Sequence, residues 1–436
     1  MKPYIMSLTE ASDAIQGGEL TPKRLAESLL KRIRETEPMI HAWVTIDTEK
    51  VMEDAANATE TSPMSRLHGI PIGIKDIYYT AGMRTTMGSS IYWDYVPEID
   101  ADIVKKIKEQ GATVLGKTET TEFATHDPAP TRNPWNTNHT PGGSSSGSAA
   151  AVASGMCSAA FGSQTGGSVI RPSSYCGIVG VKPTYDLLSR GGVYPVSWSL
   201  DHVGYMTRIV EDAYHILCAL TNTDKVWKKR EKPPKIGVLR GYFMENAKPD
   251  VWEGYEKTIT DLWGKGADMI DAILPSSFKN VPDVHRVIMA AETAAVHEEV
   301  FREKKPQYGE YIQGLISSGL LIPATVYLRA QRQRAKIIED MIHLIKEYDC
   351  VVCPSTVDTA PEGLEWTGSP AFNAPWSLTG LPSVTVPMGL AENKLPIGLQ
   401  LIGTPYNEWS LLSVAGWCEE KLGFDTSPKD PYVPES

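Results

Sequence analysis

Residues 141–172 constrain the fold of this chain more than any other segment. They read PGGSSSGSAAAVASGMCSAAFGSQTGGSVIRP, with one Gly-Gly-Ser triplet on each side of a run of alanine. A flexible linker is polar throughout, whereas here the serines lead directly into the alanines. A helix of such small residues is stable only when another element packs closely against it. The segment therefore predicts a glycine-rich loop followed by a buried helix.

Two familiar loops share this composition. The phosphate-binding pattern G-x-x-x-x-G-K-[ST] is absent, and residues 141–171 contain no lysine, which argues against a nucleotide site. Residues 143–147 match G-x-S-x-G, the nucleophile elbow of α/β-hydrolases, with Ser145 as the nucleophile and a distant histidine as the base. That elbow follows a hydrophobic strand, but residues 133–141 are rich in turn formers. An esterase that uses Ser145 is thus an alternative with weak support.

A lysine can replace histidine as the base for a serine nucleophile. Lys75 lies in a predicted buried strand, residues 70–77, where loss of hydration lowers the pKa of an amine. The alternative is a structural ion pair between Lys75 and a buried acid. Gly166 and Gly167 precede Ser168 and offer consecutive N–H groups, as an oxyanion hole requires.

Short strand-like runs alternate with helical segments along the rest of the chain. Helical patterns cover the first forty residues, where Ser7 and Thr21-Pro22 give N-terminal signals, and most of residues 282–348. This alternation predicts an α/β architecture. The predicted strands are residues 70–77, 112–116, 235–239, 349–353, 383–386 and 396–402.

Several segments together resemble the amidase signature family, and the resemblance covers nearly the whole chain. It implies one α/β/α domain over residues 1–436, with a large mixed β-sheet flanked by helices. Within it we expect N-terminal helices (1–65), the signature core (66–210) and a mostly helical lobe (280–350). The matching segments are residues 69–76, 142–152, 164–172, 176–184, 373–387 and 395–402.

The resemblance also implies a Ser-cisSer-Lys triad that hydrolyses a small or aryl carboxamide through an acyl-enzyme. Water then releases the carboxylate, and neither a metal nor an organic cofactor is expected. Alternatives within the family are a carbamate- or urea-type hydrolase and the catalytic subunit of an amidotransferase, which needs a partner chain. By motif position the nucleophile is Ser168, the bridging serine Ser144 after a cis peptide from Gly143, the base Lys75, and the oxyanion hole Thr165, Gly166 and Gly167.

Three further positions bear on substrate binding. Arg171 either binds a substrate carboxylate or anchors its loop, and the fork of donors on arginine favours the anchor. His126 lies either in the pocket wall or in a turn. Gln164 stands where many relatives carry aspartate, which changes the charge of the loop but leaves the triad intact. A small-molecule-binding protein with an inactive triad is disfavoured because all three triad residues are present.

The charge of the chain limits the classes of molecule that it can be expected to bind. Lys and Arg number 42 against 53 Asp and Glu, a formal net charge of −11, and no basic stripe stands out. We therefore expect no nucleic-acid and no membrane partner.

Residues 1–16 lack the apolar segment of a secretory signal, which predicts a cytoplasmic protein. The amphipathic N-terminal helices would suit a homodimer contact, and Cys350-Val-Val-Cys353 reads as part of a buried strand rather than a metal or redox pair.

Overall fold

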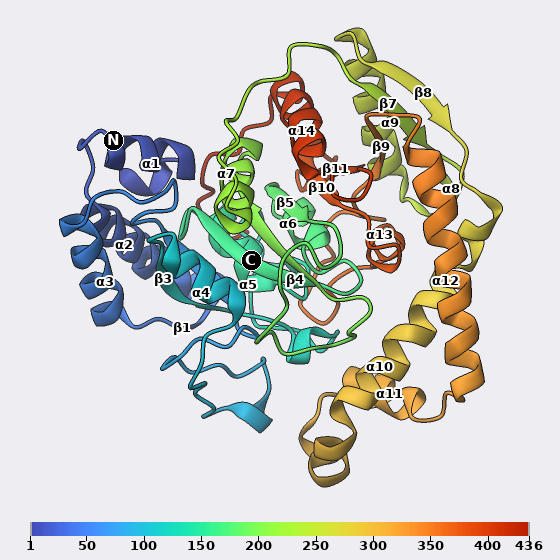
Figure 1. Ribbon diagram of the computed structural model, residues 1–436, viewed down its shortest axis with the longest axis horizontal. Coiled ribbons are helices and arrows are strands. Elements are labelled where there is room, and N and C mark those ends of the chain that lie inside the picture. Colours follow the sequence, from blue (N-terminus) through green and yellow to red (C-terminus); the bar gives the residue numbers. More distant parts are fainter. Residues whose placement is uncertain (1, 435–436) are drawn as a thin grey trace.

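A single β-sheet organises the molecule. The computed structural model describes residues 2–434 and contains a mixed sheet of eleven strands, in the order β1-β3-β2-β4-β6-β5-β10-β11-β9-β7-β8, flanked by helices (Figure 1). The strands are β1 Trp43–Thr45, β2 Pro71–Lys75, β3 Thr113–Thr118, β4 Ala159–Gln164, β5 Val179–Lys182, β6 His202–Thr207, β7 Lys235–Leu239, β8 Asp268–Ala272, β9 Cys350–Pro354, β10 Ser383–Leu390 and β11 Pro396–Ile402.

Helices cover the sheet and also form a separate group at one side, where α10, α11 and α12 lie together (Figure 1). The α-helices are α1 Leu8–Gln16, α2 Pro22–Ile40, α3 Thr48–Glu60, α4 Asp102–Glu109, α5 Ser146–Ala153, α6 Ile170–Tyr175, α7 Val210–Thr221, α8 Tyr242–Asn246, α9 Pro249–Gly264, α10 Val281–Lys304, α11 Glu310–Gly319, α12 Ala324–Ile345, α13 Ala374–Leu378 and α14 Glu408–Leu422. Short 3₁₀ helices span Pro3–Ile5, Ser90–Tyr92, Glu122–Ala124, Ser276–Asn280 and Lys305–Gln307.

The N-terminal helices begin where the sequence predicts. The Ser7 side chain accepts a hydrogen bond from the Glu10 N–H while the Glu10 carboxylate accepts one from the Ser7 N–H, which makes a complete capping box for α1. Helix α2 starts at Pro22 after Thr21, whose hydroxyl accepts from the Arg24 N–H.

Two neighbouring strands near the centre of the sheet, β2 and β4, end on the same side of it. Strand β2 runs parallel to β4, with Ile72 opposite Ala159 and Ile74 opposite Phe161. Because the strands are parallel, their C-terminal residues, Lys75 and Gln164, lie at the same edge of the sheet. Polar residues that follow these two ends can therefore meet.

The alanine-rich segment forms the buried helix α5, as predicted. All eight of its residues are buried, and it packs against β2, β3 and β4. Small residues are required here: a Cβ on Gly147 would lie 2.2 Å from the Ala42 carbonyl oxygen. The composition of this helix thus follows from the closeness of its neighbours.

The predicted strands are all present, but five others are not evident from the sequence. These additional strands are β1, β4, β5, β6 and β8. Strand β4, with the sequence AAFGSQ, is poor in the branched residues that favour strands, and its burial on both faces removes any alternation. Cys350 and Cys353 lie buried in β9, as expected.

Within residues 2–434 we find no single helix long and apolar enough to cross a membrane. Only α11 and α12, bent by 99° relative to each other, reach the required length and composition as a pair.

Candidate active site

The amine of Lys75 is enclosed by hydroxyl groups at the end of β2. Its Nζ lies 2.6 Å from Ser144 Oγ and 2.9 Å from Ser163 Oγ. Burial lowers the pKa of Lys75 well below its ordinary value, and the charge of Asp201 only partly opposes this. An amine in this environment favours its neutral form, which has a lone pair that can accept a proton from Ser144.

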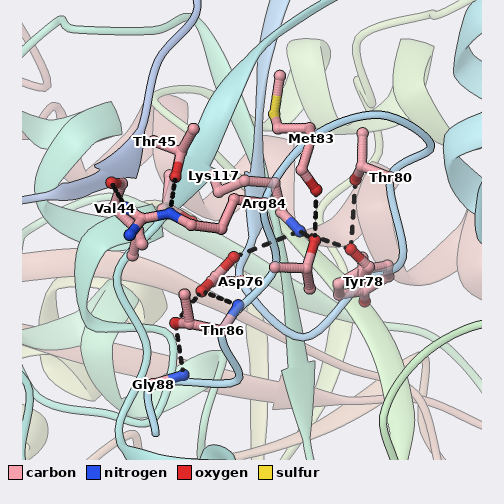
Figure 2. Close-up of polar contacts among 12 residues, drawn as sticks. Val44, Thr45, Asp76, Tyr78, Thr80, Met83, Arg84, Thr86, Gly88 and Lys117 are labelled. Carbon is pink, nitrogen blue, oxygen red and sulfur yellow. Dashed lines mark hydrogen bonds and ion pairs between the residues drawn. The ribbon is translucent and has the colours of Figure 1, made fainter. Parts of the chain in front are cut away.

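The carboxylate next to Lys75 in the sequence pairs with a different lysine. Asp76 Oδ1 lies 3.4 Å from Nζ of Lys117, both side chains are fully buried, and Lys117 also donates to Tyr78 O and Thr85 Oγ1 at 2.6 Å each. The second carboxylate oxygen of Asp76 accepts from the N–H and hydroxyl of Thr86, as Figure 2 shows. Burial lowers the pKa of Lys117 to about 8, against the effect of Asp76. Lys117 thus neutralises Asp76 and leaves Lys75 without a paired acid.

We expect Lys117→Met to reduce the free energy of unfolding by about 3–5 kcal/mol, because it strands the Asp76 carboxylate in the interior. Urea unfolding measures this loss. The double variant with Asp76→Asn is the control, and it should lose less than the two single variants summed because no buried charge is left unpaired. A loss under about 1 kcal/mol in the single variant contradicts the expectation.

Arg171 holds the loop that carries Ser144. The peptide bond between Gly143 and Ser144 is cis. The buried guanidinium of Arg171 donates from Nη2 to the Gly143 carbonyl oxygen at 2.7 Å and to Thr367 Oγ1 at 3.3 Å. Its Nε and Nη1 have no hydrogen-bond partner in the described part of the chain. Arg171 therefore has the contacts of a loop anchor.

Ser168 is the most exposed of the three triad candidates. It lies on the turn between β4 and α6, with 8% of its surface exposed, against 1% for Ser144 and 0% for Lys75. The Ser145 N–H donates to the Ser168 carbonyl oxygen at 3.3 Å, which ties the two serine loops together. Among residues 2–434, no hydrogen bond joins the Ser168 and Ser144 hydroxyls. Exposure thus decreases from Ser168 through Ser144 to Lys75.

The backbone before Ser168 turns its carbonyl groups away from its N–H groups. The Thr165 carbonyl oxygen accepts from His285 Nε2 at 3.0 Å, and that of Gly166 accepts from Ser377 Oγ at 2.8 Å. In a trans peptide the C=O and N–H bonds point in opposite directions, so the N–H groups of Gly166 and Gly167 face away from these partners. Within the described residues, neither N–H makes a hydrogen bond. Two such N–H groups can bind an oxyanion.

Thr165 is also fixed through its side chain. Its hydroxyl donates to Asp201 Oδ1 at 2.6 Å, while Asp201 Oδ2 accepts the N–H groups of Val196 and Ser197. Burial raises the pKa of Asp201 to about 6. Asp201 therefore joins the turn before Ser168 to the loop at residues 196–201.

His126 lies against the ring of an aromatic side chain. Its ring stacks on Trp366 at 6.0 Å with an interplanar angle of 17°. Burial lowers the pKa of His126 to about 4, and the nearby Arg171 and His285 contribute to this shift. His285 also has a pKa lowered by burial. Burial thus favours the uncharged form of both imidazoles.

The structure lacks the elements that a Ser145 elbow needs. No strand lies between β3 and α5 in the described chain. The Ser145 hydroxyl is instead occupied by the backbone of Ser163, whose N–H donates to it at 3.3 Å and whose carbonyl accepts from it at 3.4 Å. Ser145 thus serves to join α5 to β4.

A cavity of about 390 Å³ borders the Lys75 side of the site. Ser163 and Asp201 line it, together with Arg190, Tyr194 and His202. Ser144 and Ser168 do not contribute to its wall. This cavity therefore does not contain the candidate nucleophile, and we do not assign it to the reacting group of a substrate.

Four residues of the site are not predicted as site residues from the sequence. Ser163 lies in β4, a strand that the sequence does not predict, and Asp201 follows an irregular loop. His285 and Ser377 lie more than 100 residues after the Gly-Gly-Ser turn that they contact. Only the fold brings them to it.

Comparison with known proteins identifies the family. A family model described as Amidase matches residues 24–412. The chain belongs to the amidase family. The glutamyl-tRNA(Gln) amidotransferase A-subunit of Halothermothrix orenii is 32% identical to this amidase, over 98% of this chain and 99% of the relative.

Solved structures agree with this assignment. An amidase crystal structure superposes with a TM-score of 0.89 at 29% identity, covering 96% of this chain and 100% of the other. The native peptide amidase from Stenotrophomonas maltophilia gives a TM-score of 0.83 at 27% identity, with 98% of each chain covered. The mixed α/β fold expected from the sequence is confirmed. This amidase is an enzyme that acts on amide C–N bonds, as a hydrolase or an amidotransferase.

Proposed function

We propose that this amidase hydrolyses small or aryl carboxamides through an acyl-enzyme on Ser168. The observation that carries the proposal is the Lys75 amine, fully buried and bonded to Ser144 and Ser163 hydroxyls rather than to an acid. Burial favours the uncharged form of such an amine, which can act as the base that a serine nucleophile requires.

In the acylation step, Ser168 Oγ attacks the amide carbonyl carbon. Its proton passes to Ser144, and the Ser144 proton passes to Lys75. The carbonyl oxygen becomes negatively charged and is stabilised by the N–H groups around Thr165, Gly166 and Gly167. The C–N bond then breaks as the proton on Lys75 returns through Ser144 to the leaving nitrogen, which departs as ammonia or an amine.

In the deacylation step, water takes the place of the departed amine. Ser144 and Lys75 accept its proton as it attacks the ester carbonyl, and Ser168 leaves with that proton restored. The products are free enzyme and a carboxylic acid, which loses its remaining proton to solvent and leaves as the carboxylate. These steps use only the named side chains, backbone N–H groups and water.

The proposal of an uncharged substrate rests on the turn before Ser168. The Thr165 carbonyl there bonds to His285 Nε2 at 3.0 Å, and burial lowers the pKa of His285, which favours the uncharged imidazole. Arg171 donates from Nη2 to the Gly143 carbonyl, while its Nε and Nη1 have no hydrogen-bond partner within residues 2–434. Those two donors are the feature that would instead favour a substrate with a carboxylate.

A second candidate function is the ammonia-producing subunit of an amidotransferase. The 32% identity to the Halothermothrix orenii amidotransferase chain, over nearly the full length, favours it. The name of that relative includes glutamyl-tRNA(Gln), so the absence of a nucleic-acid partner stays a prediction for this chain.

We expect the isolated chain to release ammonia or amine from benzamide, propionamide or acetanilide, with kcat/KM at least tenfold above that for glutamine. Discontinuous ammonia assays and chromatography of the products measure this, with phenyl carbamate and urea in the same panel. Turnover of glutamine alone, and only after a partner chain is added, favours the amidotransferase. Preference for the carbamate or urea identifies the other C–N hydrolase class.

A further inference from the structure

We propose that Gln164 and Ser377 are positioning residues for the oxyanion hole, forming a one-way hydrogen-bond chain that fixes the peptide between Gly166 and Gly167. This inference rests on the proposed function, because it concerns the N–H groups that bind the reacting oxygen. It assigns a role to the Gln164 amide and to Ser377 on α13, a helix distant in sequence.

The orientation of the Gln164 amide is determined by its surroundings. Its Oε1 accepts the N–H groups of Val169 and Ile170 at 2.9 and 3.0 Å. The opposite orientation would direct the NH₂ group at two donors, so it is excluded. Nε2 therefore faces Ser377 Oγ, at 3.1 Å. Gln164 and Ser377 are both fully buried, so bulk solvent does not compete for these atoms.

The direction of the next bond follows from the first. Ser377 Oγ accepts a proton from Gln164 Nε2, so its own proton is free to be donated, and the Gly166 carbonyl oxygen lies 2.8 Å away. This bond holds the carbonyl toward α13 and turns the Gly167 N–H to the opposite side. An aspartate or glutamate anion at position 164 could accept from Val169 and Ile170 but could not donate to Ser377.

Two neighbouring contacts hold the same loop in the same sense. His285, on α10, donates to the carbonyl of Thr165 and so fixes the preceding peptide. A Cβ on Gly167 would lie 2.6 Å from Asn373 Oδ1, so the loop rests directly against the residue before α13. The carbonyl groups of the loop that forms the hole are therefore held by hydrogen bonds from His285 and Ser377.

The variant Gln164→Glu tests the direction of the chain by replacing the amide NH₂ with an oxygen that titrates. When the introduced carboxyl group is protonated, its O–H can donate to Ser377 and the chain is intact. When that carboxyl group ionises, the Ser377 hydroxyl donates to the carboxylate instead, because a charged acceptor binds it more strongly than an amide carbonyl does. The Gly166 carbonyl then loses its donor.

We expect the ratio of variant to parent kcat for benzamide to fall as pH rises, by about 10²-fold over the ionisation of the introduced carboxyl group, with KM changed less than threefold. Labelling of Ser168 by a fluorophosphonate should slow in parallel, because its reaction also places negative charge in the hole. If the introduced carboxylate acted only through its charge on Lys75, it would raise the pKa of Lys75, and the ratio of variant to parent kcat would be lowest at low pH. A ratio that rises with pH in this way, or a ratio of one at every pH, overturns the proposal.

Ser377→Ala provides a second test that does not depend on a new charge. It should lower kcat by about 10- to 100-fold at every pH, with little change in KM. Thr379→Val is the matched control, since the Thr379 hydroxyl lies in the same region but donates to Pro375 O at 2.8 Å and does not contact the loop. Equal losses in both variants overturn the proposal. Turnover retained by Ser168→Ala would contradict the proposed function. An inactive Ser168→Ala together with an unimpaired Ser377→Ala would contradict this inference alone.

Discussion

Ser168→Ala is expected to lower kcat by about 10⁴-fold or more, because it removes the atom that forms the acyl-enzyme. The N–H groups of Gly166 and Gly167 remain in place, so binding of substrate should change little. Initial rates of ammonia release at saturating benzamide, or at the best substrate of the panel, measure the loss. Covalent labelling by a fluorophosphonate should disappear in the same variant.

Ser145→Ala is the control for this prediction. Its hydroxyl contacts only the backbone of Ser163, so we expect kcat within about tenfold of the parent. Inactivity of Ser145→Ala together with activity of Ser168→Ala would reverse the assignment and favour an esterase-type nucleophile.

Lys75→Met is expected to lower kcat by about 10³- to 10⁵-fold, because no other amine or imidazole in the described chain contacts the Ser144 hydroxyl. In the parent, kcat/KM should rise with pH as Lys75 loses its proton, with a midpoint well below the ordinary lysine pKa of 10.5. Rate profiles from pH 5 to 10 locate that midpoint. A residual rate with the same rising limb in Lys75→Met would show that another group is the base.

The lowered pKa of Lys75 also makes the free energy of unfolding depend on pH. Between the native pKa and 10.5, the unfolded chain binds a proton at Lys75 and the folded chain does not. The free energy of unfolding of the parent should therefore rise with pH relative to that of Lys75→Met, by about 1.4 kcal/mol per pH unit within this interval. Urea unfolding at several pH values measures the slope, and parallel curves for the two proteins would contradict it.

The sequence predicts the parts of the site that depend on local composition. The Gly-Gly-Ser triplets, the small-residue helix α5 and the lysine in a buried strand each carry a pattern that follows from packing or charge. The resemblance to the amidase signature family implies roles for Lys75, Ser144 and Ser168, which stay predictions, and the cis peptide that it implies before Ser144 is present in the structure.

The remaining parts depend on contacts between distant segments. Ser163 and Gln164 lie in β4, whose alanines and glycine resemble a continuation of the helix rather than a strand. His285 reads as one residue of a long amphipathic helix, and its contact with Thr165 arises only because α10 packs beside α13. No periodicity within a single segment encodes such a contact.

The bond from Ser377 to Gly166 spans 211 positions of the chain. At about 5–20 residues per second, synthesis of the intervening segment takes about 10–40 seconds. During that interval the loop that contains Ser168 has already been made, but the helix that bonds to its backbone has not. Under the proposed roles, a nascent chain therefore carries Ser168 without a fixed oxyanion hole, and activity arises only after most of the polypeptide has been translated.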